Sequence, residues 1–179
     1  MKLIILDRDG VVNQDSDAYI KSVEEWIPIP GSLEAMARLY QGGYRLAIAS
    51  NQSGLGRKLF SIDDLNAIHR KLTRELSALG AQVEAIFFCP HAPEAKCFCR
   101  KPLPGLLHDI ASRFQIDLRG VPCIGDSLRD LDAAIAVGAS PILVRSGKGE
   151  QTIACHAGDL GTTPIFADLA DVADYILAC

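Results

Sequence analysis

Residues 3–12 read LIILDRDGVV, and this stretch decides the fold. Four consecutive apolar residues, two of them β-branched, predict a strand that is buried on both faces. Two carboxylates, Asp7 and Asp9, follow on either side of Arg8, and Gly10 lets the backbone turn directly after them. Because side chains alternate along extended chain, Asp7 and Asp9 are expected to point to one side and Arg8 to the other. The stretch predicts a paired-carboxylate site at the carboxyl end of a buried strand.

The paired carboxylates suit a divalent cation and chemistry at phosphorus. Two like charges this close repel each other unless a cation lies with them, and hard oxygen ligands favour Mg²⁺. One carboxylate can attack phosphorus while a second protonates the leaving group and then activates water. An Asp-x-Asp-Gly sequence can equally be an ordinary turn. Its place after a strand favours the catalytic alternative, because open α/β sheets bind ligands beyond the carboxyl ends of their strands.

Length and composition favour one domain. The chain has 179 residues, enough for one well-packed domain and too few for two, so we expect a single domain over residues 1–179. Hydrophobic residues make up 49% of the chain, yet no apolar run approaches the roughly 20 residues of a membrane helix. In the opening MKLIILDRDG, charged residues follow an apolar run of only four residues, which is shorter than the apolar run of a signal peptide. We therefore expect a cytoplasmic protein without membrane contact.

The charge balance bears on the partners of the protein. The formal net charge is −4, whereas binding to a nucleic-acid backbone depends on clustered Lys and Arg. We therefore expect a small substrate and no nucleic acid. No apolar stripe is left over in the predicted elements, so a monomer is expected.

Strand and helix patterns alternate along the rest of the chain. Apolar runs predict further strands at residues 44–49, 83–88, 121–124 and 141–144. Helical spacing, capping residues and glycine stops predict helices at residues 33–41, 61–79, 104–115, 127–137, 151–156 and 168–177. The irregular, polar residues 13–30 are expected to form a loop over the site. This order predicts an α/β protein of three layers, a Rossmann-like parallel sheet flanked by helices, with no insertion long enough for a cap domain.

A second cluster of ligand-type residues lies at residues 89–99. Cys89, His91, Cys97 and Cys99 supply three thiolates and one imidazole, the ligand set of a closed structural zinc site. One residue separates each pair, so both members of a pair face the same way in extended chain and two such arms can hold a tetrahedral ion. Disulfides or buried free thiols are the alternatives. Three cysteines match no ligand pattern: Cys123, expected in the core, and Cys155 and Cys179, which stay unassigned.

Arg100 and Lys101 follow the last zinc-type cysteine directly. A loop held by a metal ion would present these two cations in a fixed place, at a small entropic cost on binding. We therefore expect the zinc to order the loop and to take no part in the chemistry.

Other polar residues also fall just beyond predicted strands. Ser50 and Asn51 follow the second strand, in a cluster of short polar side chains that could also be a plain turn. Lys101 lies on the loop after the third strand, and Asp126 follows the fourth. Because the carboxyl ends of parallel strands share one edge, we expect these residues to converge on Asp7.

Three further polar residues are harder to place. Asp130 is either an exposed acid in the first turn of a helix or a contributor through the water shell of a metal. His69 is expected to be a solvated helix residue, and His108 to lie at the surface or rim.

The motifs DRDG, SNQSG, a following Lys and GDSLRD, in this order, resemble the haloacid dehalogenase superfamily of phosphatases that form an aspartyl-phosphate. The resemblance covers nearly the whole chain. It implies that Asp7 is the nucleophile, Asp9 the general acid and base, and Ser50 and Lys101 the stabilisers of the phosphoryl group. It also implies that Mg²⁺ is held by Asp7, Asp126 and the backbone carbonyl of Asp9.

The motifs CPH and CxCRKPLPG, with DRDGVVN and SNQSGLGR, are similar to the zinc-containing, capless branch of that superfamily. This implies Mg²⁺ and Zn²⁺ as cofactors and a heptose bisphosphate as substrate, in the supply of lipopolysaccharide precursors. Histidinol phosphate is the alternative substrate. Two functions of another class stay open, a phosphoaspartate receiver and a zinc-dependent binding module without turnover. The resemblance implies substrate contacts by Arg8, Asp15, Ser16, Asp17, Ala18, Asn51, Gln52, Ser53, Arg100 and Ser127. Departures are Ser50 in place of Thr, a shorter zinc loop, and Ser127 where some members carry Lys.

Overall fold

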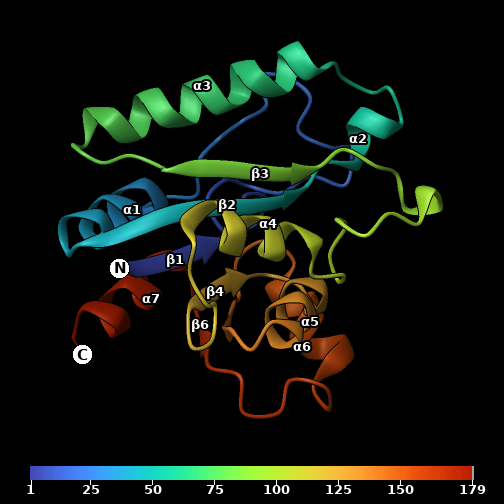
Figure 1. The fold of residues 1–179 in the computed structure, drawn as a ribbon. Helices are drawn as coiled ribbons and strands as arrows, with labels where there is room; N and C mark the ends of the chain where they lie inside the picture. Colours follow the sequence, from blue (N-terminus) through green and yellow to red (C-terminus); the bar gives the residue numbers. More distant parts are fainter. Residues whose placement is uncertain (179) are drawn as a thin grey trace.

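The fold is built on a parallel sheet with the acidic strand in its middle. The computed structural model describes residues 1–178, so Cys179 lies outside the described part. The described strands form a six-stranded sheet in the order β3-β2-β1-β4-β5-β6 (Figure 1). They are β1 (Lys2–Leu6), β2 (Tyr44–Asn51), β3 (Ala85–Cys89), β4 (Pro122–Gly125), β5 (Ser140–Val144) and β6 (Ile165–Phe166). Strand β1 pairs in parallel with β2 on one side and with β4 on the other, which places its carboxyl end at the centre of the sheet edge.

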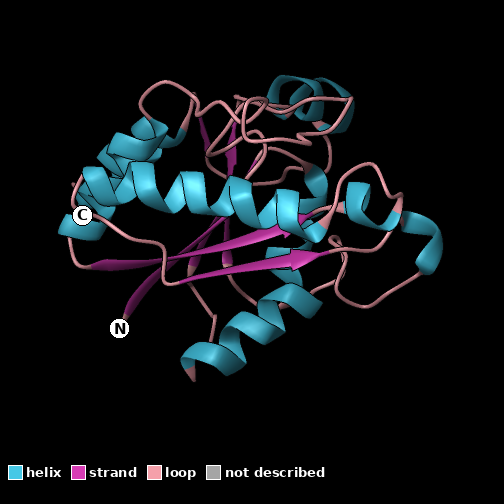
Figure 2. Cartoon of the chain, turned by 90° about the horizontal axis from the view of Figure 1, so that it is seen from above, coloured by secondary structure: helices cyan, strands magenta, loops and turns pink. Residues whose placement is uncertain are grey.

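Helices cover both faces of this sheet (Figure 2). They are α1 (Ser32–Gln41), α2 (Ser53–Gly56), α3 (Ile62–Ala78), the 3-10 turn η1 (Pro93–Ala95), α4 (Gly105–Phe114), α5 (Leu128–Ala136), α6 (Gly149–His156) and α7 (Leu169–Leu177). Alternate residues of β1 face opposite layers: Ile4 and Leu6 pack with α1, α3 and α7, whereas Leu3 and Ile5 pack with α4 and α5. The predicted three-layer α/β fold is confirmed.

Local sequence signals explain where several helices begin. Helix α3 starts after a capping box in which Ser61 and Asp64 each accept from the other's backbone N–H, as the sequence predicted. The side chain of Asp168 accepts from the first backbone N–H groups of α7. These caps determine where α3 and α7 begin, and both helices belong to the layer that packs against β1 and β2.

The sequence did not predict β6, α2 or η1, and several boundaries differ by one or two residues, such as the start of β3 at Ala85 instead of residue 83. Strand β6 has two residues and no apolar run, and only its backbone pairing with β5 identifies it. Helix α2 is a single turn with two glycines, too short to show helical periodicity. Strand β2 continues through Ser50 and Asn51, which pair with β3, so the turn expected there begins one or two residues later.

Only loops cover the carboxyl edge of the sheet. The connection from β1 to α1 contains no helix or strand among the described residues, and the connection from β3 to α4 contains only η1. The first of these loops is anchored by Trp26, which is fully buried, and by the backbone bond from Gln14 to Ile27. No cap domain is inserted at either place.

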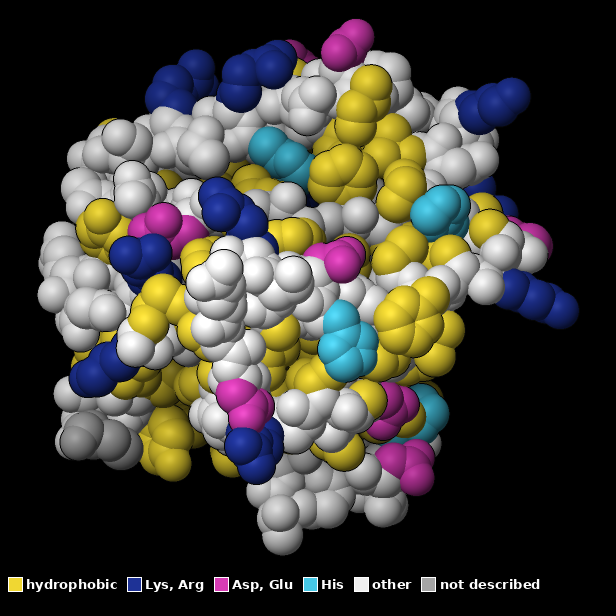
Figure 3. All heavy atoms as spheres, in the orientation of Figure 1, with side chains coloured by type: hydrophobic (Ala, Val, Ile, Leu, Met, Phe, Trp, Pro, Cys, Tyr) yellow, Lys and Arg dark blue, Asp and Glu magenta, His cyan; other side chains and the backbone are white. Residues whose placement is uncertain are grey.

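The surface and the helices bear on the expected partners. On the face seen in Figure 3, basic and acidic side chains are scattered without a continuous patch of one sign.

None of the described helices has the length and apolarity to span a bilayer.

Candidate active site

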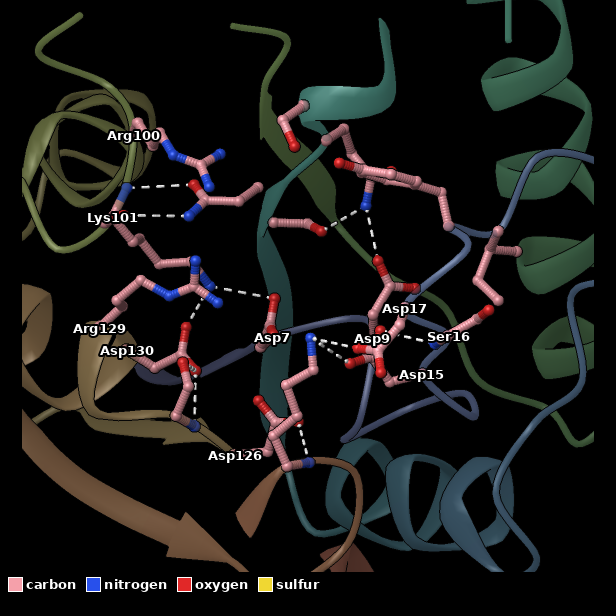
Figure 4. A pocket seen from close by; sticks show the side chains of 18 residues that line it. Asp7, Asp9, Asp15, Ser16, Asp17, Arg100, Lys101, Asp126, Arg129 and Asp130 are labelled. Carbon is pink, nitrogen blue, oxygen red and sulfur yellow. Dashed lines mark hydrogen bonds and ion pairs between the residues drawn. The ribbon is translucent and has the colours of Figure 1, made fainter. Parts of the chain in front are cut away.

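A cleft opens where the carboxyl ends of β1, β2 and β4 meet the loops (Figure 4). The acidic pair and the polar ends of β2 and β4 form its floor, and the β1–α1 loop forms one wall. The lining comprises Asp7, Asp9, Asp15, Ser16, Asp17, Tyr19, Ile20, Ser50, Asn51, Gln52, Ser53, Arg100, Lys101, Asp126, Ser127, Arg129, Asp130 and Lys148. The residues predicted from four separate stretches of sequence are thus brought together.

Lys101 lies at the centre of the floor and is almost fully buried. Its Nζ is 3.0 Å from Oδ1 of Asp7 and 2.5 Å from Oδ1 of Asp130, and it donates to the carbonyl of Ala49 at 2.7 Å. Burial alone would lower the pKa of Lys101, but Asp130 and Asp7 outweigh it and raise the pKa. Lys101 is therefore a fixed cation beside Asp7.

Asn51 holds Lys101 by its backbone. The Asn51 side chain accepts from the backbone N–H of Lys101 at 3.1 Å and donates to the carbonyl of the same residue at 3.0 Å. Both ends of the amide are used, so its orientation is fixed. Asn51 lines the cleft, as expected, and in addition positions Lys101.

Asp130 is buried, so its interpretation as an exposed helix acid was wrong. Burial raises the pKa of its carboxyl, but Lys101 outweighs burial and lowers it. The other oxygen accepts from the hydroxyl of Ser127 at 2.6 Å and from its backbone N–H at 3.0 Å, which caps α5. Asp130 thus links the start of α5 to Lys101.

Asp9 is held by three donors. Arg8 donates to both of its oxygens, Asn13 donates to Oδ1 at 2.8 Å, and Gln52 donates to Oδ2 at 2.8 Å. Burial alone would raise the pKa of Asp9, but Arg8 and these hydrogen bonds outweigh it and lower the pKa. Gln52 also donates to the hydroxyl of Ser50 at 2.7 Å, so one amide joins two site residues.

Arg8 points away from the cleft, as expected, but it does not make the substrate contact implied for it, and His69 is not the solvated residue expected. The Arg8 side chain is fully buried, does not line the cleft and turns back to Asp9, so it positions Asp9 and does not reach a substrate. His69 is only partly exposed, with Nε2 3.4 Å from a guanidinium nitrogen of Arg8. Burial and Arg8 lower the pKa of His69 to about 4, so its ring is neutral near pH 7. Sequence spacing gave no sign of this contact across 61 residues.

Three carboxylates could hold a cation. Oxygen atoms of Asp7, Asp126 and Asp130 all lie within 4.8 Å of one another. Burial, Asp130 and Asp9 raise the pKa of Asp7 to about 7 despite Lys101, and burial with Asp7 and Asp130 raises the pKa of Asp126 to about 8. Such crowding of carboxylates fits a site for a hard divalent cation, which would relieve the repulsion.

Backbone atoms of two loops lie close to the carboxylate of Asp126. A Cβ added to Gly10, whose φ is +88°, would lie 1.9 Å from Oδ2 of Asp126. The same oxygen accepts from the backbone N–H of Lys148 at 2.7 Å, and Gly147 also leaves no room for a Cβ. The glycine after the acidic pair is therefore required by the contact with Asp126 as well as by the turn.

Four ligand-type atoms meet in the loop at residues 89–99. The Sγ atoms of Cys89, Cys97 and Cys99 lie 3.2 to 3.5 Å apart, and Nδ1 of His91 is 3.3 Å from Sγ of Cys99. Tetrahedral zinc with bonds of about 2.3 Å would hold its sulfur ligands roughly 3.8 Å apart, so the sulfur atoms lie a few tenths of an ångström closer together than in a zinc site. The described cysteines are all free thiols, so disulfides in this loop are not formed. Cys123 is buried in the core, as expected, and Cys155 is exposed.

Several lining residues had no signal in the sequence. Lys148, from the start of α6, lies 3.1 Å from Asp15 and 3.4 Å from Asp17, and so joins the β1–α1 loop to the far side of the cleft. Tyr19, Ile20 and Arg129 also line the cleft. The expected contact residue Ala18 is not part of the lining. These positions depend on loop conformation, which periodicity cannot predict.

An aspartate-lined site with a buried lysine at the carboxyl edge of a parallel sheet defines a phosphatase of the haloacid dehalogenase class. Two family models match the chain, "Polynucleotide kinase 3 phosphatase" at residues 2–127 and "HAD-hydrolase-like" at residues 98–172. The chain is 56% identical to the D-glycero-beta-D-manno-heptose-1,7-bisphosphate 7-phosphatase of Bordetella bronchiseptica, over 99% of this chain and 98% of that protein. It is 53% identical to the protein of that name from Pseudomonas putida, over 97% and 98%. The chain belongs to the family of these heptose bisphosphate phosphatases.

Solved structures agree with this assignment. The crystal structure of the D,D-heptose 1,7-bisphosphate phosphatase of B. bronchiseptica, complexed with magnesium and phosphate, has a TM-score of 0.97 and covers 99% of both chains at 56% identity. The phosphatase of the same name from Burkholderia thailandensis has a TM-score of 0.78 at 43% identity and covers both chains fully.

Proposed function

We propose that this protein is a magnesium-dependent phosphatase that removes the 7-phosphate of D-glycero-β-D-manno-heptose 1,7-bisphosphate through an aspartyl-phosphate on Asp7. The observation that carries the proposal is the contact of Asp7 with Lys101 inside the group of three carboxylates. A carboxylate nucleophile, a fixed cation and a cation-binding site then meet at one point. The supply of lipopolysaccharide precursors, the cytoplasmic location and the monomeric state stay predictions.

The reaction has two steps at phosphorus. A carboxylate oxygen of Asp7 attacks, the bond from phosphorus to the sugar oxygen breaks, and Asp9 gives its proton to that oxygen. Asp9 then takes a proton from water, which attacks the phosphorus, releases inorganic phosphate and restores Asp7. Lys101 and the hydroxyl of Ser50 stabilise the charge on the phosphoryl oxygens. Mg²⁺, held by Asp7, Asp126 and the backbone carbonyl of Asp9, would neutralise charge on the phosphate.

Asp9 must change its protonation state during this cycle. Without substrate, Arg8 and the amide donors keep the pKa of Asp9 low, which suits the base of the second step. A phosphate dianion beside Asp9 raises that pKa, which suits the acid of the first step. The proton can therefore enter with the substrate.

We also propose that Cys89, His91, Cys97 and Cys99 bind Zn²⁺ and that the ion is structural. Four protein ligands fill a tetrahedral shell and leave no open position for chemistry. The cluster precedes Arg100 directly, so the metal would fix the segment that carries the cations of the cleft.

The test is a side-by-side assay of the purified protein with Mg²⁺ on the heptose bisphosphate and on histidinol phosphate. We expect phosphate release from the bisphosphate, and loss of release on Mg²⁺ removal or in Asp7→Asn. The relatives named above are heptose enzymes, so histidinol phosphate should be the poorer substrate. Preference for histidinol phosphate would contradict the assigned substrate. Binding without turnover would favour a receiver or a binding module.

A further inference from the structure

Arg8 is a fully buried cation held between a carboxylate and a histidine ring. Its Nε donates to Oδ1 of Asp9 at 3.0 Å, and its Nη2 donates to Oδ1 and Oδ2 at 2.8 and 3.1 Å. The remaining nitrogen, Nη1, lies 3.4 Å from Nε2 of His69, which is 61 positions away in the chain. Asp9 and His69 thus hold the guanidinium group from two sides.

The chemistry of the contact decides which partner donates. A guanidinium group has five N–H donors and no acceptor, so Nη1 of Arg8 donates and Nε2 of His69 accepts. Burial and the charge of Arg8 lower the pKa of His69 to about 4, so the ring is neutral near pH 7 and keeps a lone pair on Nε2. The ring proton is then on Nδ1. His69 therefore supplies the acceptor for the one nitrogen of Arg8 that does not bind Asp9.

His69 is itself held in place by the fold. It lies in α3, which runs along β3 (Figure 1), and its ring centroid is 6.0 Å from that of Phe88 in β3. Its neighbours on the helix Ile68 and Leu72 are fully buried in the core, which anchors this part of α3. The ring is a fixed contact for Arg8.

The contacts from His69 to Arg8 and on to Asp9 control the direction of a carboxyl group. A general acid must aim its proton at the departing oxygen, and Arg8 contacts both oxygens of Asp9, so a turn of the guanidinium group turns the carboxyl group as well.

We propose that His69 is a positioning residue for the general acid: it acts through Arg8 and orients Asp9 toward the bridging oxygen of the substrate. The proposal rests on the function proposed above and deepens it. His69 is not among the residues that line the cleft, so its effect is on proton transfer and not on substrate contact.

The test compares two substrates of the Mg²⁺-loaded protein that differ only in the leaving group. One is heptose 1,7-bisphosphate, and the other carries sulfur in place of the bridging oxygen at C7. A sugar alkoxide needs the proton of Asp9 to leave, whereas a thiolate leaves without it, because thiols have a pKa of about 8.5. For both substrates, kcat/KM reports the steps up to the transfer of the phosphoryl group to Asp7.

His69→Leu removes the acceptor and keeps a side chain of similar size. It should lower kcat/KM for the oxygen ester about 10- to 100-fold, a part of the contribution of a general acid, and change that of the sulfur analogue by about 3-fold or less. His69→Gln, which keeps an acceptor oxygen near the place of Nε2, should recover part of the loss. His156→Leu, at a histidine of α6 whose side chain is 44% exposed, is the matched control and should behave as wild type.

The outcomes separate the two proposals. Equal loss on both substrates in a folded His69→Leu protein, or wild-type kinetics on both, would overturn the role of His69 while wild-type turnover upholds the proposed function. Thermal unfolding shows whether the variant folds, and His69→Asn, whose amide is too short to reach Arg8, replaces it with the same expectation where it does not. Wild-type protein without activity on the bisphosphate would overturn the proposed function and this inference with it.

Discussion

The position of Lys101 shows how single side chains set the chemistry of the site. Its ammonium group is held between Asp7 and Asp130, while its backbone is held at both polar groups by Asn51. Asn51 contributes no charge, and its effect is to limit where the lysine can be. Catalysis by fixed charges depends on such support, because a small displacement weakens the stabilisation of the transition state.

Asn51→Ala should therefore lower kcat about 10- to 100-fold, as for other residues that orient a catalytic group. Lys101 keeps its charge in this variant and loses only its backbone support. Steady-state kinetics with the bisphosphate measure the effect, and Asn66→Ala, at an exposed position of α3, is the control. Wild-type kcat in Asn51→Ala would show that Lys101 is held without the amide.

The crowded carboxylates predict a pH dependence of stability in the metal-free protein. The pKa values of Asp7 and Asp126 are raised from 3.8 to about 7 and about 8. Their protonated forms stabilise the fold at low pH, and this contribution is lost as the pH rises through those values. Without metal, the melting temperature should fall between pH 5 and pH 8, and Mg²⁺ should restore it.

Asp126→Asn should weaken this fall, because one of the repelling charges is gone, and should also reduce the rescue by Mg²⁺. Thermal unfolding with and without EDTA measures both effects. A melting temperature of the metal-free wild type that does not change over this pH range would show that the carboxylates do not repel as the geometry indicates.

At the scale of elements, the loop at residues 89–99 supports the substrate side of the cleft. It leaves β3 and leads through Arg100 and Lys101 into α4, with no secondary structure of its own except η1. The spacing of its cysteines and histidine was readable in the sequence because ligands close in the chain need no knowledge of the fold. The place of the loop over the cleft was not readable, since it depends on how β3 ends.

Zinc removal, by a selective chelator with Mg²⁺ resupplied or by Cys97→Ser, should raise KM for the bisphosphate by about 10-fold or more. Ordering two long side chains costs about 0.5 to 1.5 kcal/mol each, and the loosened loop would have to order Arg100 and Lys101 on binding. Cys155→Ser, at an exposed cysteine outside the cluster, is the control. An unchanged KM in a verified zinc-free protein would refute the structural role.

The turn after β1 gives a second prediction at this scale. Gly10 and Gly43 both have positive φ, +88° and +86°, but a Cβ on Gly43 would meet nothing within 4 Å. Gly43→Ala should cost only the backbone strain of about 1–2 kcal/mol. Gly10→Ala should add about 1–3 kcal/mol of overpacking against Asp126 and lose magnesium-dependent activity. Denaturant unfolding and activity assays compare the two, and equal effects would contradict the contact with Asp126.

At the scale of the whole molecule, one sheet edge gathers residues that are far apart in the chain. Asp7 and Asp9 follow β1, while Ser50 is the second-last residue of β2 and Asp126 follows β4. The sequence predicted this convergence because buried parallel strands are strong periodic signals and their carboxyl ends share an edge.

What the sequence did not predict follows from contacts between distant residues. The burial of Asp130 depends on Lys101, the place of His69 depends on Arg8, and the bridge of Lys148 to Asp15 depends on the path of two loops. Strand β6 is too short for any periodic pattern. Such features are set by tertiary packing, which local spacing does not contain.

The most direct test of the central claim is detection of the phosphorylated nucleophile. The wild-type protein is mixed with substrate and Mg²⁺, quenched in acid within a turnover and digested with trypsin. Cleavage after Lys2 and Arg8 releases residues 3–8, a peptide whose one carboxylate side chain is Asp7. We predict that its mass increases by one phosphoryl group, and that the increase is absent from Asp7→Asn. Full turnover with no phosphorylated peptide at any quench time would contradict attack by Asp7.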